Sequence, residues 1–176
     1  IAEKCDMLVT NSQNTKELLI EKKIAKEERI EVIHNGIKIP EMEIAQNQKT
    51  ILYAGSIKEI KDPITFVRAC HYVIKKNNSV KVIMAGEGPM RLAVEQYLRE
   101  NKLDNNFKLL GEVEYNRIPY REASVFVNSS LRESNSNSIL EALSFGIPVV
   151  ATDNPGNRDI LSRMEHHKLV TPCRRV

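Results

Sequence analysis

Tryptophan is absent from this sequence, and aromatic residues make up only 5% of its 176 residues. Few rings are therefore available to stack on nucleic-acid bases, and the formal net charge of +3 attracts a phosphate backbone only weakly. Long hydrophobic runs are also missing, because none approaches the roughly 20 residues that cross a bilayer. We therefore expect a soluble protein that does not bind nucleic acid.

Cysteine is scarce as well. Cys5, Cys70 and Cys173 are odd in number and far apart in the sequence, which excludes a disulfide framework and disfavours a zinc site. Free thiols are typical of a reducing compartment, so the sequence favours a cytoplasmic location. Hydrophobic residues make up 41% of the chain, which excludes disorder and is enough to build a core.

Short runs rich in valine, isoleucine and leucine alternate with segments in which apolar residues have helical spacing. This alternation is typical of a parallel sheet with helices on both faces, and it predicts an α/β fold. Asp62-Pro63 predicts one helix start, and Gly88-Pro89 predicts another. The expected strands are residues 7–10, 30–33, 50–54, 80–85, 107–110, 125–127 and 148–151.

A polar connector divides the chain. Asn35-Gly36 predicts a turn, and a mostly polar stretch follows it. We expect an upstream domain to end with residues 1–34, a linker at 35–49, the main α/β domain at 50–170 and a truncated tail at 171–176.

The strongest functional signal lies in residues 128–151, where an expected strand leads into a polar loop and then a short helix that starts near Asn137. In an open α/β sheet, ligands bind outside the carboxyl ends of the strands, and the free N–H groups at a helix start favour a phosphate or diphosphate. Glu133 and Glu141 flank this helix start, and carboxylates accept hydrogen bonds from sugar hydroxyls. The arrangement indicates a nucleotide-sugar site.

Both carboxylates also have structural explanations. Ser138 and Glu141 have the spacing of an S-x-x-E capping box, in which the glutamate only closes the helix start. An isolated glutamate such as Glu133 is usually solvated surface. The joint placement of the two carboxylates favours the functional interpretation.

The same segment resembles a known enzyme family. Glu133 to Glu141 is similar to the Glu-x7-Glu motif of the retaining glycosyltransferases of the group 1 family (family 4), and residues 142–152 resemble the signature that follows it. The resemblance covers nearly the whole chain, in order and with the family's spacing. Its other blocks are Ile33-His-Asn-Gly-Ile37, Ile51-Leu-Tyr-Ala-Gly55 with Lys61-Asp62, Ile83-Met-Ala-Gly-Glu-Gly-Pro89 and Leu110-Gly-Glu-Val113.

This resemblance implies a fold and an activity. The main domain would be the Rossmann-like, C-terminal half of a GT-B fold, and residues 1–34 would end its acceptor domain. The enzyme would transfer a hexosyl group from a nucleotide-diphosphate sugar to an acceptor glycan or lipid with retention of configuration, in polysaccharide, lipopolysaccharide or glycolipid synthesis. It would act in the cytoplasm, at the inner face of the membrane when peripherally associated, and the isolated chain would be inactive alone.

The resemblance also implies roles for single residues. Glu133 would contact the donor hexose and Lys61 the diphosphate, and these two are the predicted catalytic residues. A fixed ammonium beside the diphosphate would act mainly in the transition state, when charge accumulates on the leaving group. The predicted substrate-binding residues are Ser56, Gly111, Glu112 and Val113 (the last three at the base), Asn135, Ser136, Asn137 and Ser138 near the diphosphate and sugar, and Glu141 at the ribose.

Two positions depart from the family pattern. Ser56 stands where the family has an arginine, so one charge-assisted hydrogen bond to the diphosphate, worth roughly 1.5 to 3 kcal/mol, is missing. Lys58 and Arg132 are the candidates to replace its charge. Asn135 and Ser136 stand where many members have an aromatic residue and a glycine, which predicts a more polar sugar pocket.

Two other functions stay open from the residues. Gly86-Glu-Gly88 begins the G-x-G motif of NAD-binding domains, but the third glycine position is Arg91. A non-catalytic nucleotide-sugar-binding subunit would also fit Ser56. No cofactor and no metal are expected, because there is no Asp-x-Asp motif and His166-His167 lacks a third ligand.

Overall fold

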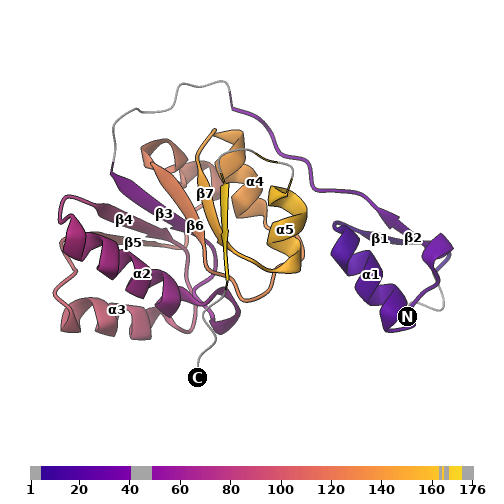
Figure 1. Cartoon of the computed structure of the whole chain (residues 1–176), viewed down its shortest axis with the longest axis horizontal. Coiled ribbons are helices and arrows are strands. Elements are labelled where there is room, and N and C mark those ends of the chain that lie inside the picture. Colours follow the sequence, from indigo (N-terminus) through magenta and orange to yellow (C-terminus); the bar gives the residue numbers. More distant parts are fainter. Residues whose placement is uncertain (1–4, 41–48, 163, 165–166, 172–176) are drawn as a thin grey trace.

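Two parallel sheets organise the protein (Figure 1). The computed structural model describes residues 5–40, 49–162, 164 and 167–171. In the smaller sheet, β1 (Leu8–Thr10) pairs with β2 (Ile30–Val32), and α1 (Gln13–Glu21) lies between them in the chain. The larger sheet has the strand order β5-β4-β3-β6-β7-β8, and all its pairings are parallel.

The larger sheet alternates strands with helices along the chain. Its strands are β3 (Thr50–Ala54), β4 (Lys81–Ala85), β5 (Phe107–Gly111), β6 (Val125–Asn128), β7 (Val149–Thr152) and β8 (His167–Val170). The α-helices are α2 (Pro63–Lys76), α3 (Arg91–Glu100), α4 (Asn137–Ser144) and α5 (Pro155–Leu161). Single 3-10 turns are η2 (Glu27–Arg29), η3 (Glu59–Lys61), η4 (Tyr115–Arg117) and η5 (Tyr120–Glu122). Parallel pairing needs such long connections between neighbouring strands.

Helices cover both faces of the larger sheet because successive strand residues point to opposite sides. In β3, Leu52 and Ala54 belong to the core that α4 and α5 cover, whereas Tyr53 belongs to the core that α2 and α3 cover. The predicted α/β fold, a Rossmann-like parallel sheet with helices on both faces, is confirmed.

The predicted start of α2 is also confirmed. The Asp62 side chain accepts a hydrogen bond from the Thr65 amide at 3.4 Å, and Pro63 occupies the first turn, where its missing N–H costs nothing. Asn154 and Pro155 repeat the arrangement at α5, where the Asn154 side chain accepts from the Asn157 amide at 3.0 Å.

Two predictions about elements were incomplete. No strand was expected at β8, because His167–Val170 lacks an apolar run. β8 pairs with β7 at the edge of the sheet, where a strand is more solvated than in the centre. The helix expected at Gly88-Pro89 begins at Arg91, because Gly88 lies against the loop after β3. A Cβ at Gly88 would lie 2.3 Å from the Ile57 carbonyl oxygen, which accepts from the Met90 amide at 3.0 Å.

Hydrogen bonds join the segment around the smaller sheet to the larger unit. The Gln13 amide at the start of α1 donates to the Asp159 carboxylate of α5 at 3.3 Å, and the Asn135 side chain donates to the Asn11 carbonyl at 2.7 Å. Figure 1 shows α1, β1 and β2 beside α5. Of the expected tail, residues 172–176 lie outside the described residues. Among the residues that the structure describes, no helix has the length and apolar character to span a membrane.

The packing of α2 predicts an unreactive thiol. Cys70 is buried in the core between α2 and the sheet, and burial raises its pKa to about 12. Because the thiolate is the reactive form, Cys70 should react with Ellman's reagent more than about 100-fold more slowly in the folded chain than in urea. A variant with Cys5 and Cys173 replaced by serine isolates this thiol. Equal rates in both solvents would contradict the packing.

Candidate active site

The carboxyl ends of β3 and β6 meet where the strand order reverses. From β3 the chain proceeds through β4 to β5 on one side and then returns to β6 on the other side of β3. At such a switch point, the loops after the two central strands diverge and leave a crevice that commonly holds the ligand. The loop after β3 carries Lys61, and the loop after β6 carries Glu133.

The two predicted catalytic residues form an ion pair. Lys61 Nζ donates to Glu133 Oε1 at 2.5 Å, across 72 positions of sequence. Glu133 Oε1 also accepts from Ser130 Oγ at 2.7 Å and from Asn128 Nδ2 at 3.2 Å. The Glu133 side chain is only 9% exposed, so the interpretation of this residue as solvated surface is wrong. Three donors on one oxygen offset the cost of burying its charge.

The loop after β6 is fastened to the segment that carries Lys61. Ser129 Oγ donates to the carbonyl oxygens of Lys61, at 2.8 Å, and Asp62, at 3.0 Å. The Leu131 amide donates to the Ile60 carbonyl at 2.8 Å. Since Asp62 also caps α2, the helix, the lysine and the glutamate loop are held as one unit.

On its other side, the same loop is fastened to the start of α5. Thr152 Oγ1 donates to the Ser130 carbonyl at 2.5 Å, and Asn154 Nδ2 donates to it at 3.0 Å. Asn157 Nδ2 donates to Asn128 Oδ1 at 3.3 Å, so the residue that holds Glu133 is itself held. All five side chains or backbone groups in these contacts come from buried residues.

Sequence reasoning missed this buried polar support. Its members are Asn128, Ser129, Ser130, Thr152, Asn154 and Asn157. The available signal was a run of small polar residues directly after an apolar strand, at Asn128-Ser-Ser130 and again at Thr152-Asp-Asn154. Buried polar groups need partners, and these groups find them in one another, in Glu133 and in the carbonyl groups of Lys61 and Asp62.

Glu141 lies on α4, and its partner is a tyrosine. Tyr120 Oη donates a hydrogen bond to Glu141 Oε2. Burial raises the pKa of Glu141, and the hydrogen bond from Tyr120 partly offsets this by lowering it. The capping-box interpretation is wrong, because the N-cap of α4 is Ser136 and Ser138 lies within the helix.

The start of α4 lacks a side-chain cap. Ser136, at the N-cap, gives the backbone no side-chain hydrogen bond, since its hydroxyl bonds Asn128 and Ser138 instead. At α1, α2 and α5 a side chain accepts from the first turn, whereas α3 also lacks such a cap. The predicted diphosphate residues Asn137 and Ser138 are the first two of this helix, where N–H groups lack intrahelical acceptors.

Several of the predicted substrate-binding residues line two cavities. Ser56, Glu112 and Val113 line one of about 420 Å³, next to the loop after β4. Gly111 adjoins it, and its carbonyl accepts from the Gly86 amide at 2.7 Å. Asn137 and Glu141 line another of about 450 Å³, together with Tyr115 and the linker segment from Asn35 to Lys38.

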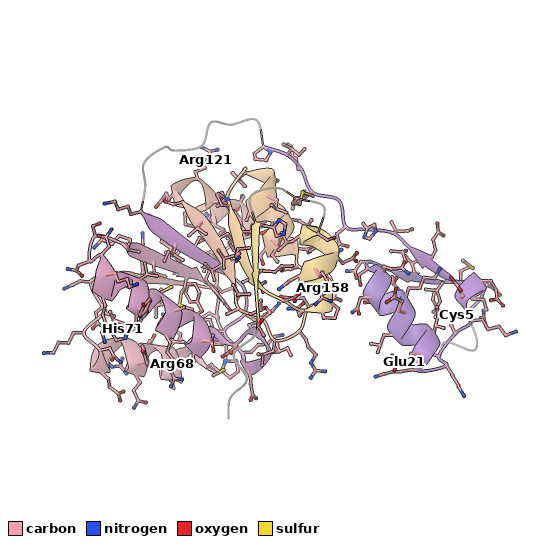
Figure 2. The ribbon with its side chains drawn as sticks, in the orientation of Figure 1. Cys5, Glu21, Arg68, His71, Arg121 and Arg158 are labelled. Atoms are coloured by element: carbon pink, nitrogen blue, oxygen red, sulfur yellow. The ribbon has the colours of Figure 1, made fainter. Side chains whose placement is uncertain are left out.

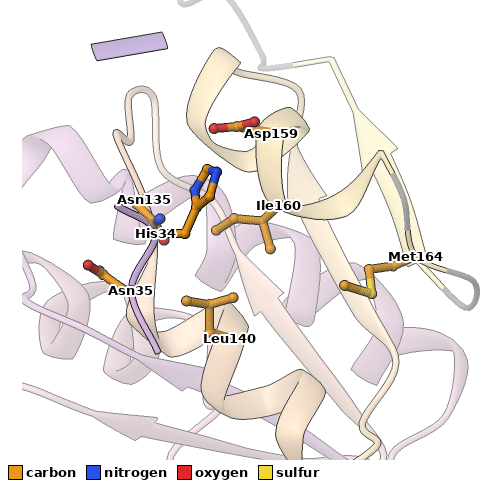
Figure 3. A pocket seen from close by; sticks show the side chains of 7 residues that line it. All are labelled: His34, Asn35, Asn135, Leu140, Asp159, Ile160 and Met164. Atoms are coloured by element: carbon orange, nitrogen blue, oxygen red, sulfur yellow. The ribbon is translucent and has the colours of Figure 1, made fainter. Parts of the chain in front are cut away.

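Asn135 is placed apart from these residues. It lines a cavity of about 190 Å³ with His34 and Asn35 from the linker and with Leu140, Asp159, Ile160 and Met164 (Figure 3). Figure 3 shows His34 and Asn135 next to each other at this cavity, although they lie far apart in the sequence. Asn135 Oδ1 is buried without a partner among the described residues.

Ser56, at the position of the family arginine, carries no charge. Ser56 is half-buried, and its carbonyl oxygen accepts from Tyr53 Oη at 2.9 Å. Lys58 and Arg132 are exposed, so their side chains have room to turn toward a bound anion. Arg91 is engaged elsewhere, because Glu87 and Glu95 both pair with it.

Within the described ranges, no group of three or more histidine, cysteine or acidic side chains is arranged to hold a metal ion.

A Rossmann-like parallel sheet with polar loops at the carboxyl ends of its central strands is typical of nucleotide-binding domains. Residues 48–175 match the family described as glycosyl transferases group 1, and the chain belongs to this family. It is 30% identical over 127 residues to the 2-deoxystreptamine N-acetyl-D-glucosaminyltransferase of Niallia circulans, covering 71% of this chain and 33% of that protein. It is 24% identical over 176 residues to the alpha-monoglucosyldiacylglycerol synthase of Streptococcus pneumoniae, covering 89% and 40%.

Solved structures of glycosyltransferases share the fold. TarM of S. aureus, crystallised with UDP and a GlcNAc-glycerol, superposes with a TM-score of 0.86 at 20% identity, over 98% of this chain and 35% of that one. HepE of Anabaena, crystallised with UDP and glucose, superposes with a TM-score of 0.84 at 19% identity, over 96% and 50%. These neighbours have the GT-B fold, as expected. The chain spans between a third and a half of the length of the relatives and neighbours named here.

The loop that carries Glu133 packs so closely against Gly156 that this glycine should not tolerate a side chain. A Cβ at Gly156 would lie 2.3 Å from the Glu133 carbonyl oxygen, so Gly156→Ala must push the loop away from α5. We expect this variant to lose about 1 to 3 kcal/mol of stability in urea unfolding. Gly36→Ala is the matched control, because nothing lies within 4 Å of its added Cβ. Equal stability of the two variants would contradict the contact.

Proposed function

We propose that this chain is the donor-binding part of a glycosyltransferase that moves a hexosyl group from a nucleotide-diphosphate sugar to a glycan or lipid acceptor. The observation that carries the proposal is the Lys61–Glu133 ion pair at the switch point of the sheet. Membership of the group 1 family supports the reaction, and relatives named as acetylglucosaminyl- and glucosyl-transferring enzymes support the sugar class. Neighbours crystallised with UDP make a uridine nucleotide the first donor to test.

The diphosphate would occupy the crevice between Lys61 and the start of α4. It carries negative charge, which both the ammonium and the N-terminal end of the helix dipole attract. As the glycosidic bond breaks, further charge develops on the departing diphosphate, so these groups stabilise the transition state more than the bound donor. This arrangement supplies without a metal what a bound cation supplies elsewhere, and we propose a metal-independent reaction.

The two glutamates would hold the donor at its two ends. Glu133 would accept hydrogen bonds from hydroxyls of the hexose, and Glu141 from those of the ribose, because ionised carboxylates are acceptors only. Asn135, Ser136, Asn137 and Ser138 would lie between them, and Gly111, Glu112 and Val113 would line the base. We propose transfer with retention, as the family resemblance implies, and assign Glu133 to donor binding rather than to nucleophilic attack.

The smaller sheet would belong to the acceptor side of the enzyme. We propose that residues 1–34 end the acceptor domain, that 35–49 link it to the donor domain at 50–170, and that the chain alone transfers no sugar. Synthesis of a polysaccharide, lipopolysaccharide or glycolipid at the inner face of the membrane is the proposed setting.

A binding screen tests the donor proposal. Isothermal titration of the chain with UDP, GDP, ADP and NAD, each with EDTA present, should show binding of a nucleoside diphosphate in preference to NAD. Lys61→Ala should weaken this binding by about 10- to 100-fold, because a charge-assisted contact to a diphosphate is lost. Preference for NAD, or an absolute need for a divalent metal, would contradict the proposal.

Turnover in the enzyme that contains both domains separates catalyst from binding subunit. Glu133→Ala should reduce kcat/KM by at least about 100-fold with UDP-sugars, because it removes a donor contact and leaves Lys61 without its partner. Lys168→Ala is the control, since this exposed residue lies on β8. Full activity of Glu133→Ala would remove this residue from the site.

Replacement of the missing arginine's charge can be tested separately. We expect Lys58→Ala with Arg132→Ala to weaken nucleoside diphosphate binding by about 5- to 30-fold, as the loss of one or two exposed cations near an anion would. Ser56→Arg should restore that affinity in the double variant. Unchanged affinity of the double variant would show that these cations do not replace the arginine.

A further inference from the structure

Tyr120 is a buried tyrosine whose hydroxyl reaches the predicted ribose site. The residue is only 1% exposed, and its ring belongs to the core that α4 and α5 cover. It stacks on Phe145 with 5.2 Å between ring centroids and meets Phe126 at 6.2 Å. These contacts hold the ring, so its hydroxyl has a fixed place beside Glu141.

Tyr120 contacts α4 at two points one turn apart. Glu141 and Phe145 are separated by four positions and therefore lie on the same side of the helix. The ring packs on Phe145, while the hydroxyl donates to Glu141 Oε2. A carboxylate on a flexible side chain rotates freely about its last bond, and a hydrogen bond to one of its oxygens sets the plane of both.

The hydrogen bond from Tyr120 uses one oxygen of Glu141, and the other can accept from a ligand. Glu141 lines the cavity of about 450 Å³ together with Asn137, Tyr115 and the linker. The tyrosine that holds it comes from the same β5–β6 connection that supplies the predicted base-side residues. One connection therefore supports both the base wall and the ribose carboxylate.

We propose that Tyr120 is a positioning residue that orients Glu141 for the 2′- and 3′-hydroxyls of a nucleoside diphosphate and so sets the preference for ribose over deoxyribose. The inference rests on the proposed function, because it needs a nucleotide in this crevice. It predicts that the tyrosine hydroxyl matters only when the ligand has a ribose hydroxyl for Glu141 to accept from.

Binding of UDP and 2′,3′-dideoxy-UDP, which lacks both ribose hydroxyls, tests this role by calorimetry. Tyr120→Phe should bind UDP about 5- to 30-fold more weakly than the unchanged chain and bind 2′,3′-dideoxy-UDP with nearly unchanged affinity. Tyr97→Phe is the control, because the hydroxyl of Tyr97 contacts His71 of α2, outside the site (Figure 2). Thermal unfolding of both variants checks that the fold is retained.

Two further readouts exclude a merely structural role. In a Glu141→Ala background there is no carboxylate to orient, so adding Tyr120→Phe should change UDP affinity less than about twofold. Ribose hydroxyls donate to the ionised carboxylate, so affinity is lost as pH falls through the pKa of Glu141. Tyr120→Phe removes a hydrogen bond that lowers this pKa, so its loss of affinity should begin at higher pH. Lys38 and Tyr115, the other titratable groups named in this cavity, are unchanged in both.

The outcomes separate the two proposals. If the unchanged chain binds UDP and Tyr120→Phe keeps its ratio of UDP to 2′,3′-dideoxy-UDP affinity, the positioning role is overturned while the proposed function stands. An equal loss of affinity for both ligands in Tyr120→Phe also overturns the positioning role, because it indicates general damage to the site. If the unchanged chain binds no nucleoside diphosphate, the proposed function fails, and this inference fails with it.

Discussion

A nearly buried carboxylate is the constraint on which the polar contacts at the carboxyl ends of β3 and β6 depend. Glu133 is charged and 9% exposed, so it must be paired and hydrogen-bonded to remain in place. Lys61 supplies the opposite charge, and Asn128 and Ser130 supply neutral donors to the same oxygen. Asn128 is held by Asn157 of α5, and Ser130 by Thr152 of β7 and by Asn154. The contacts around one buried charge therefore connect the ends of β3, β6 and β7.

The two glutamates of the crevice are held by different chemistry. Glu133 has a cation as its first partner, whereas Glu141 has a neutral phenol from an aromatic cluster. A bound diphosphate would compete with Glu133 for Lys61, because both are anions that the ammonium attracts. No such competition arises at Glu141, whose partner is uncharged and buried. In the proposed function, donor binding would therefore rearrange contacts at the sugar end of the crevice and leave the ribose end as it stands.

Much of the fold could be predicted because its signals are local. Seven strands were expected as apolar runs, and the start of α2 was expected from Asp62-Pro63. β8 escaped prediction because an edge strand needs no apolar run. The approach of Gly88 to Ile57 escaped it because it joins two loops that only the sheet brings together. In the site, the pair of glutamates could be found from spacing, while Tyr120 could not, since it lies 21 positions before Glu141 and looks like any core aromatic residue.

The sequence by itself determined the α/β pattern, the family and the residue types gathered after β6, since each of these depends on short-range order along the chain. Only the tertiary structure decided which of those residues meet. The contact between Lys61 and Glu133 spans 72 positions, and it exists because parallel pairing puts the carboxyl ends of β3 and β6 side by side. The capping-box spacing of Ser138 and Glu141 was equally visible, yet α4 begins at Asn137 and its glutamate turns to a buried tyrosine. The tertiary packing prevailed over the capping-box pattern. Ser136 is already the N-cap of α4, and the half-buried Glu141 carboxylate gains more from a donor in the core than from the helix start.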